Sequence, residues 1–430
     1  MRRPRARTLQ LAAVMAASAA ITAACGVSNA ATTGGLAAGP TGTPITVGVS
    51  QPLSGPAQAQ GFAPDGQACL KGYELWASDV NSHGGLNGHP VKLIVMNDEG
   101  WPASTEYDYK WLINHDHVDL TLAPFSSLLT AAGAVPATEP LRYVLPAGSA
   151  GAPSVYLKKD PYLFSTNVPV AGQMLPFAKW VVTLPHHPLT AAYPQVSDPF
   201  ADPPVDTAET YLEGKGITTV YTNTKSPYSP TASNAQLVAD ARIVAHHHPG
   251  IVLLGSIAVS TVEDFLKGFA QAHFTPQLFI ASSGPDQGQA FLDSVGTSNA
   301  IGMMVPNGWF GSYPNALSHV MVQDYIAKYG GTASDINADV AESYSAGETI
   351  QAAVEATHGT NQVGLANWLH KHTVQTVLGP VKFESDGENS DAANAALIFQ
   401  WQPGAGGTGA KFVQILPKSN VDSVAPLMQG

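Results

Sequence analysis

Strand-like and helix-like segments alternate along most of this 430-residue chain. Short runs rich in Val, Ile and Leu predict strands at residues 45–50, 90–98, 118–124 and 143–146. Amphipathic runs predict helices among them, at residues 66–84 and 104–116. Because parallel strands need a long crossover and helices usually supply it, this alternation predicts an open, mostly parallel α/β sheet.

A second series of the same kind follows and predicts a second α/β lobe. Its strands are expected at residues 188–194, 217–223, 251–259 and 277–282, and its helices at 205–214, 233–247 and 261–273. Later segments predict helices at 318–330 and 338–358 and strands at 379–385 and 395–404. Ligands of open α/β sheets bind beyond the carboxyl ends of the strands. Two such lobes therefore predict a ligand site in the crevice between them.

Residues 1–24 predict an export signal that is not part of the fold. The stretch "MRRPRART" holds four Arg, and the sequence from there to Cys25 is uncharged and rich in Ala. The stretch "ITAACG" is similar to a bacterial lipobox, which predicts acylation of Cys25, although "SNA" at 28–30 also fits a cleavage site. Residues 25–44 would then form a flexible tether from the membrane to the fold.

Composition and charge argue against several classes of protein. The formal net charge of −12 and the lack of a basic stripe argue against nucleic-acid binding. Hydrophobic residues make up 44% and charged residues 12% of the chain, which is typical of a folded protein with a core. Cys69 has no partner if Cys25 is acylated, so we expect it to be a small buried side chain.

Motifs for catalysis and for metal binding are missing from the sequence. The chain has no G-x-S-x-G, Walker or H-E-x-x-H motif. Histidines cluster at residues 115–117, 185–188 and 246–250, in segments expected to be helix ends or loops. A metal site needs three or four converging ligands. We therefore expect no metal, no cofactor and no enzymatic activity.

Five segments in a fixed order resemble those of one known family. They are "ITVGVSQPLSGP" (45–56), "DVNSHGGLNGHPVKLIVMNDEGWPA" (79–103), "LAPFSSLLT" (122–130), "NAIGMMVP" (299–306) and "TVLGPVKFESDGEN" (376–389). Together they resemble the type I periplasmic binding proteins of the leucine/isoleucine/valine-binding branch, over residues 45–402. The resemblance implies two Rossmann-like, doubly wound lobes that are joined by a three-strand hinge and close on a small ligand.

The resemblance also implies where the two lobes divide. The chain crossings are expected near residues 165–169, 302–306 and 376–381. The first lobe would comprise residues 45–165 and 305–376, and the second lobe 166–304 and 377–430.

Small residues follow two successive strands of the first lobe. Ser126 and Ser127 come after the strand expected at 118–124, and Ala147 and Ser149 come after the next one. Unpaired N–H groups at a helix start favour an anion, but serines at such positions are also common helix caps. In the family that the chain resembles, the matching positions bind the ligand's carboxylate and ammonium. The resemblance thus assigns Ser126, Ala147 and Ser149 to the ligand, with Ser127 as a second donor.

Further ligand contacts are implied by the resemblance alone. Gln60 matches a side chain that covers the ligand, and Phe200 matches an aromatic residue of the second lobe that closes over it. Phe200 would serve equally well as a loop anchor. Ser256 and Ile257 match a ligand-facing strand exit.

The charge of the ligand depends on one further position. In amino-acid binders of the family, an acidic residue at the exit of the strand expected at 277–282 pairs with the ligand's ammonium. An ungapped match puts Ser282 there, and Asp286 takes the role only if the loop is displaced. Because an unpaired buried ammonium is costly, the ligand stays open among an amino acid, an organic or aromatic acid, an amide and a urea-like solute.

The resulting hypothesis is an extracytoplasmic solute-binding lipoprotein. It would close by a hinge motion on a small polar or carboxylate-bearing ligand and deliver it to the permease of an ABC importer. The resemblance implies the permease, and the lipid anchor would be the one contact with the membrane. Two alternatives stay open: a ligand-sensing or interaction lipoprotein that acts on a membrane partner without transport, and a hydrolase with an unrecognised site in the cleft.

Overall fold

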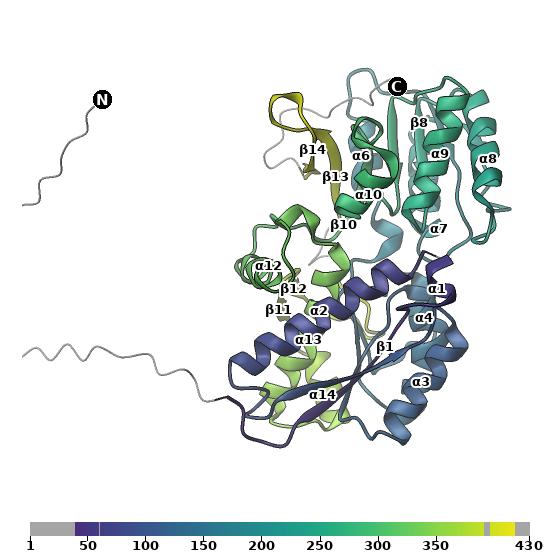
Figure 1. Cartoon of the computed structure of the whole chain (residues 1–430). Coiled ribbons are helices and arrows are strands. Elements are labelled where there is room, and N and C mark those ends of the chain that lie inside the picture. Colours follow the sequence, from purple (N-terminus) through teal and green to yellow (C-terminus); the bar gives the residue numbers. More distant parts are fainter. Residues whose placement is uncertain (1–38, 60, 391–395, 418–430) are drawn as a thin grey trace, which may run out of the picture. The chain divides into compact units, whose positions relative to one another are not determined.

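The computed structural model describes residues 39–59, 61–390 and 396–417 as a mixed α/β protein (Figure 1). The expected signal peptide, Cys25 and Gln60 lie outside these residues. Within the described part of the chain, no helix combines the length and the apolar character that crossing a bilayer requires.

The first part of the fold consists of short parallel strands and the helices that connect them. Its strands are β1 (Ile45–Gln51), β2 (Val91–Asn97), β3 (Leu120–Leu122), β4 (Leu145–Ala147) and β5 (Leu163–Ser165). Its helices are α1 (Pro56–Ala59), α2 (Ala63–Ser82), α3 (Pro102–Asn114), α4 (Ser127–Leu129) and α5 (Val135–Thr138). β1 lies between β2 and β3, and β4 pairs with β5. The Ala123 N–H donates to the Pro146 carbonyl at 2.9 Å, which brings the ends of β3 and β4 side by side.

A seven-stranded sheet forms the second part. Its strands, in spatial order, are β14 (Ala410–Leu416), β13 (Leu397–Pro403), β10 (Met304–Asn307), β9 (Leu278–Ala281), β8 (Ile251–Leu254), β6 (Thr190–Tyr193) and β7 (Thr218–Thr222). Its helices are α6 (Leu175–Val181), α7 (Asp202–Glu213), α8 (Asn234–His246), α9 (Val259–Gln271), α10 (Gly288–Val295) and α11 (Thr297–Ala300). β13 runs antiparallel to both of its neighbours, β10 and β14, and the other pairs are parallel. Helices α6 and α7 pack on one face, and α8, α9 and α10 pack on the other.

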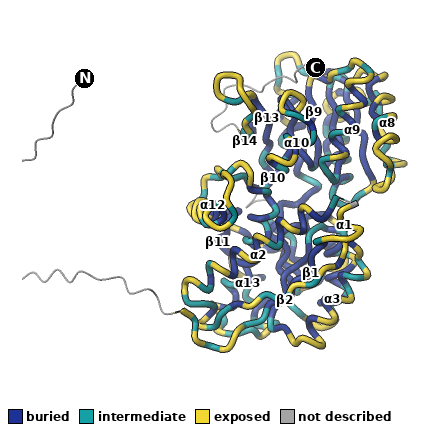
Figure 2. Tube along the Cα trace, viewed as in Figure 1, coloured by how far each residue is buried: buried dark blue, intermediate teal, exposed yellow. Residues whose placement is uncertain are grey.

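After β10 the chain returns to the first sheet. The returning elements are α12 (Ala316–Tyr329), α13 (Ala338–Thr357), α14 (Gln362–Leu369), β11 (Val374–Thr376) and β12 (Gly379–Val381). α13 packs along α2, and much of both helices is buried (Figure 2). The core between them and β1 includes Trp76, Ile350 and Val49. A Cβ atom on Gly347 would lie 2.4 Å from the Trp76 ring, so this close approach of the two helices requires glycine.

Most of the predicted elements are confirmed, and the open α/β architecture with two sheets is confirmed with them. The strand expected at 251–259 is shorter than predicted, because it ends at Leu254 and α9 begins at Val259. There Ser256 leaves the ladder and its N–H donates to the Ser282 hydroxyl at 2.8 Å. β5, β10 and β14 were not predicted as strands. β5 and β10 are short and their sequences contain or adjoin proline, which weakens the strand pattern.

The helix that follows β3 is interrupted. α4 passes through a π-helical segment, Thr130–Ala134, before α5. Pro136 has no N–H to donate to the Ala132 carbonyl, so the regular α-helical bonding cannot continue through this stretch.

The last expected crossing does not match the packing. Val381 and Phe383 belong to the core of the first sheet, and the Phe383 ring lies 5.2 Å from that of Phe164. Residues 377–383, which the resemblance assigned to the second lobe, therefore pack with the first sheet, and the crossing expected near 376–381 moves beyond Phe383. The other lobe boundaries stay a prediction.

Leu75 and Leu157 offer a matched test of this core. Leu75 of α2 is 1% exposed and packs against residues of α12 and α13, whereas Leu157 is 79% exposed. Leu75→Ala is expected to lower the free energy of unfolding by about 2–5 kcal/mol, because it leaves a cavity in the core. Leu157→Ala should change it by less than about 0.5 kcal/mol. Urea unfolding followed by circular dichroism measures both, and equal effects would contradict the packing described.

Candidate ligand-binding site

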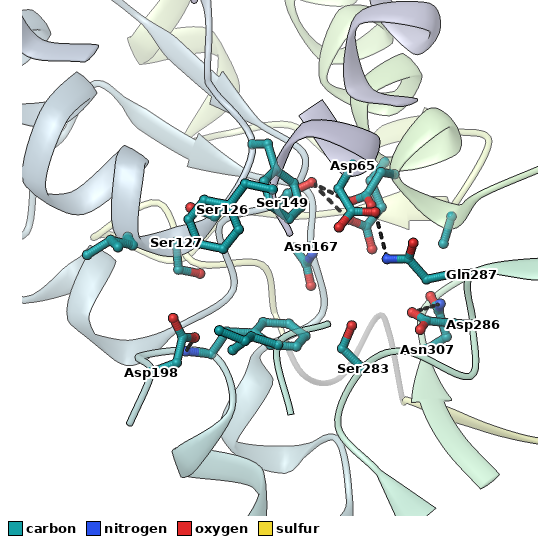
Figure 3. Close-up of a pocket in the computed structure, with 18 of the residues that line it drawn as sticks. Asp65, Ser126, Ser127, Ser149, Asn167, Asp198, Ser283, Asp286, Gln287 and Asn307 are labelled. Carbon is teal, nitrogen blue, oxygen red and sulfur yellow. Dashed lines mark hydrogen bonds between the residues drawn. The ribbon is translucent and has the colours of Figure 1, made fainter. Parts of the chain in front are cut away.

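A cavity of about 740 Å³, counting the part that is open to solvent, lies at the carboxyl ends of strands from both sheets (Figure 3). The elements of the first sheet line it with Phe62, Asp65, Phe125, Ser126, Ser127, Leu128, Ser149, Asn167, Ala338, Asp339 and Glu342. The elements of the second sheet line it with Gln173, Asp198, Phe200, Ile257, Ser283, Asp286, Gln287, Pro306 and Asn307. The crevice predicted from the sequence thus contains a cavity with polar and aromatic walls.

Ser126 and Ser127 line the cavity, as predicted, but both hydroxyl oxygens already accept hydrogen bonds. Ser126 is the N-cap of α4, and its Oγ accepts from the Leu129 N–H at 3.2 Å. Its φ of 77° lies in the region that favours glycine, so the backbone is strained at this wall of the cavity. The Ser127 Oγ accepts from the Ala152 N–H at 3.1 Å. Ser126 therefore caps α4 and lines the cavity at the same time.

Ser149 lines the cavity too, but its surroundings do not suit a ligand carboxylate. Its Oγ lies 2.9 Å from Oδ1 of Asp339 and 3.2 Å from Oε2 of Glu342, so its proton is directed to these carboxyl groups. A ligand carboxylate there would meet two acidic side chains. Ala147 is buried in the core beside α3 and is not among the lining residues. Of the two residues that the resemblance assigned to the ligand here, Ser149 therefore lines the cavity and Ala147 does not.

Three acidic side chains gather where α2 and α13 begin. Asp65 lies in the first turn of α2, and Asp339 and Glu342 lie three residues apart in the first turns of α13, on one face of that helix. Oδ1 of Asp65 accepts from the side-chain amides of Gln287 at 2.6 Å and Asn337 at 3.0 Å. The Gln287 bond joins elements of the two sheets across the cavity.

Burial makes these carboxyl groups unusually weak acids. Loss of hydration raises the pKa of Asp65, Asp339 and Glu342 well above the ordinary range, and the neighbouring carboxylates raise it further. Hydrogen bonds from Asn337 to Asp65 and from Ser149 to the other two lower the pKa, but they do not offset the burial. Among the described lining residues none is Lys, Arg or His.

Asp286 adds a fourth carboxyl group from the loop after β9. Its Oδ1 accepts from the Gly284 N–H at 2.9 Å and its Oδ2 from the Asn307 amide at 3.2 Å. Burial raises the pKa of Asp286 to about 6. Ser282, the ungapped match, is buried beneath the cavity and exchanges hydrogen bonds with Ser256. The sequence alternative in which the loop is displaced therefore agrees with the structure, and Ser282 is corrected.

The remaining predicted contacts divide into two groups. Phe200 and Ile257 line the cavity. The Phe200 N–H donates to Oδ1 of Asp198 at 2.7 Å, so a side-chain turn before α7 holds the ring in place. Ser256 is not among the lining residues, and its hydroxyl donates to the Ser283 carbonyl at 2.5 Å. Gln60 lies outside the described residues.

Several lining residues were missed by the sequence analysis. They are Asp65, Asn167, Gln173, Asp198, Asn307, Asp339 and Glu342. The spacing of Asp339 and Glu342 at the start of an otherwise small and apolar helix was the one available signal for the acidic group. In the described part of the chain no set of three or more His, Cys, Asp or Glu side chains is arranged to hold a metal ion.

Comparison with known proteins agrees with this architecture. The sequence profile described as "Periplasmic binding protein" matches residues 44–408. No curated protein that was compared matches the chain. The solved structures that are similar show the type I periplasmic binding fold, which confirms the predicted fold class.

Three of these structures illustrate the likeness. A solute-binding protein of an ABC transporter from R. palustris, in complex with 4-hydroxybenzoate, is 17% identical with a TM-score of 0.71, covering 86% of this chain and 96% of that one. LivJ from Streptococcus pneumoniae, in complex with isoleucine, is 16% identical with a TM-score of 0.68, covering 86% and 100%. The leucine-binding protein LivK from Thermotoga maritima is 13% identical with a TM-score of 0.70, covering 86% and 97%.

The raised pKa values of the cavity's carboxyl groups predict how stability depends on pH. Because the folded state holds protons on Asp65 and Glu342 more tightly than the unfolded chain does, their contribution to stability is lost as the pH rises through the folded pKa. The melting temperature of the ligand-free protein is therefore expected to fall between about pH 5 and about pH 8. The Asp65→Asn, Glu342→Gln double variant should show a smaller fall in a calorimetric scan. Equal slopes for the two proteins would contradict this assignment.

Proposed function

The chain belongs to the periplasmic binding protein family, and on that premise we propose that it captures a small polar solute in the cavity between its sheets and delivers it to an ABC importer. The observation that carries the proposal is the cavity itself, which lies at the strand carboxyl ends of both sheets and takes its walls from both. Proteins of this family bind solutes without transforming them, which agrees with the expectation that the protein is not an enzyme.

Contacts from both sides explain how binding would be coupled to closure. Phe200 and Ile257 face the cavity from the second sheet, and Phe62 and Phe125 face it from the first. A ligand that touches all of these groups gains its full binding energy only when the two sides are close together. It therefore shifts the population toward the closed form, which an importer can recognise.

Family membership implies a location outside the cytoplasm. For this chain, the Arg-rich start and the apolar run before Cys25 support export, and the acylation of Cys25 would hold the protein at the outer face of the membrane. Residues 25–44 would supply the tether. In this arrangement the protein meets the permease without a spanning segment of its own.

The ligand class follows from the walls of the cavity. The related structures are described with isoleucine or 4-hydroxybenzoate bound. In this chain Asp286 lines the cavity whereas Ser282 does not, which supports an acidic partner for a ligand amine. We therefore favour an amine-bearing solute over an organic acid, an aromatic acid, an amide or urea.

A thermal-shift screen with separate sets of amines, amino acids, aromatic acids and amides tests the function. A true ligand at 100 times its dissociation constant should add about 2.7 kcal/mol of stability, and it should be recovered chemically unchanged. Phe200→Ala should weaken its binding about 10- to 100-fold, because apolar contact with the ring is lost. Phe274→Ala is the control, since this ring packs on Phe269 outside the cavity. A solute that is converted rather than bound would overturn the proposal.

The lipid anchor has its own test. In the native host, the wild-type protein is expected in the membrane fraction with a diacylated N-terminal Cys25, and Cys25→Ser should release it into the soluble extracytoplasmic fraction. Mass spectrometry of the N-terminal peptide and immunoblots of the fractions measure this. Processing after residue 30 in the wild type would instead support the "SNA" cleavage site.

A further inference from the structure

The charge of the cavity is one-sided. Five carboxyl side chains line it, those of Asp65, Asp198, Asp286, Asp339 and Glu342, and none of the described lining residues carries a positive charge. The ion pairs in the described part of the chain lie elsewhere, on Lys110, His115, Lys158 and Lys267. When ionised, these carboxyl groups repel an anion and attract a cation, and a cation beside them lowers their raised pKa and so favours ionisation.

Three neutral donors of the cavity are already committed to these carboxyl groups. Ser149 donates toward Asp339 and Glu342, and Gln287 donates to Asp65. On the second side, Asn307 donates to Asp286. These three groups are thus turned to the protein's own carboxyl groups and are not available to a ligand carboxylate.

Neutral hydrogen bonds do not supply the missing positive charge. Taking a carboxylate out of water costs several kcal/mol unless a cation is beside it. Here the groups are near enough that each of Asp65, Asp339 and Glu342 is affected by the charge of another. A bound cation would remove both the repulsion and part of the dehydration cost.

The aromatic walls indicate an organic cation rather than a metal ion. The rings of Phe62, Phe125 and Phe200 line the cavity. The Phe62 and Phe125 rings meet edge to face with centroids 5.6 Å apart. Aromatic faces attract ammonium and guanidinium groups and pack against alkyl chains. Among the described residues, the acidic side chains do not form a metal-binding arrangement.

The acidic groups occupy two ends of the cavity. Figure 3 shows Asp65 and Asp286 on one side of the site, and Asp198 with Ser127 on the opposite side. Oδ1 of Asp198 is taken by the N–H groups of Phe200 and Ala201. Within the described part of the chain, no residue donates a hydrogen bond to its Oδ2. The Asp198 side chain also lines the cavity. A ligand with a positive group at each end matches this distribution.

We propose that the ligand is a small organic dication or polycation of the diamine, polyamine or aminoalkylguanidine class. One positive group would lie among Asp65, Asp286, Asp339 and Glu342, the alkyl chain against the phenylalanine rings, and the other positive group beside Asp198. This inference rests on the proposed function, because it names the solute class of the same cavity.

Calorimetric titration of the whole mature protein with defined probes tests it. The probes are 1,5-diaminopentane, agmatine and spermidine as dications or polycations, pentylamine as a monocation, leucine as a zwitterion, benzoate as an anion, and calcium chloride. At least one dication or polycation is expected to bind stoichiometrically and at least about 10-fold more tightly than pentylamine. Leucine, benzoate and calcium are expected not to bind.

Variants locate the charges. Asp65→Asn with Glu342→Gln should weaken the best dication at least about 100-fold, because a buried charge pair is broken. Asp198→Asn should weaken the dication more than it weakens pentylamine. Glu355→Gln is the control, since Glu355 lies exposed on the same helix as Glu342. Asp286→Asn is a second cavity variant if the double variant fails to give native circular dichroism.

The outcomes separate the two proposals. If leucine or benzoate binds stoichiometrically and the dications do not, the cation assignment is wrong while the solute-binding function stands. If calcium binds at least as tightly as the best organic dication, the organic-cation assignment is wrong. If no solute of any class binds, the proposed function and the inference both fall.

Discussion

The loss of hydration of carboxyl groups that have no positively charged partner determines which solutes this cavity can bind. Asp65, Asp286, Asp339 and Glu342 would each be more stable in water, and the hydrogen bonds from neutral amides and from Ser149 return only part of that hydration. Proteins usually avoid such an arrangement unless the site has a use for it. The charge of the solute, more than its shape, is therefore what these walls can discriminate.

The fold explains why these groups meet. α2 and α13 run side by side in the same direction. Two close contacts along the pair show this: Gly72 lies against Val340, and Trp76 lies against Gly347. The Tyr344 hydroxyl also donates to Asp79. Both helices consequently begin at the cavity. Their N-terminal dipoles favour negative charge there, which offsets some of the repulsion among the acidic side chains. The packing of α2 against α13 in the core thus places the acidic side chains of both helices together at the cavity.

The sequence predicted the fold well and the site only in part. The alternation of strand-like and helix-like segments predicted the architecture. The position of Ser126 and Ser127 after β3 was predicted because they directly follow a strand-like segment in the sequence. The partners of Ser149 could not be predicted, because Asp339 and Glu342 are distant in sequence and reach it only through the pairing of α2 with α13. The loop after β9 could not be predicted either, since the hydrogen bonds of Asp286 to Gly284 and Asn307 decide which residue faces the cavity.

The division of acidic residues between the two sides gives a reason for closure. Asp65, Asp339 and Glu342 belong to the first side, whereas Asp198 and Asp286 belong to the second. If all of them were on one side, a cation would bind the open and closed forms equally and would shift nothing. Because both sides contribute, a positive ligand between them favours ionisation of the carboxyl groups on each side and attracts both. The ligand thus stabilises the closed form more than the open one.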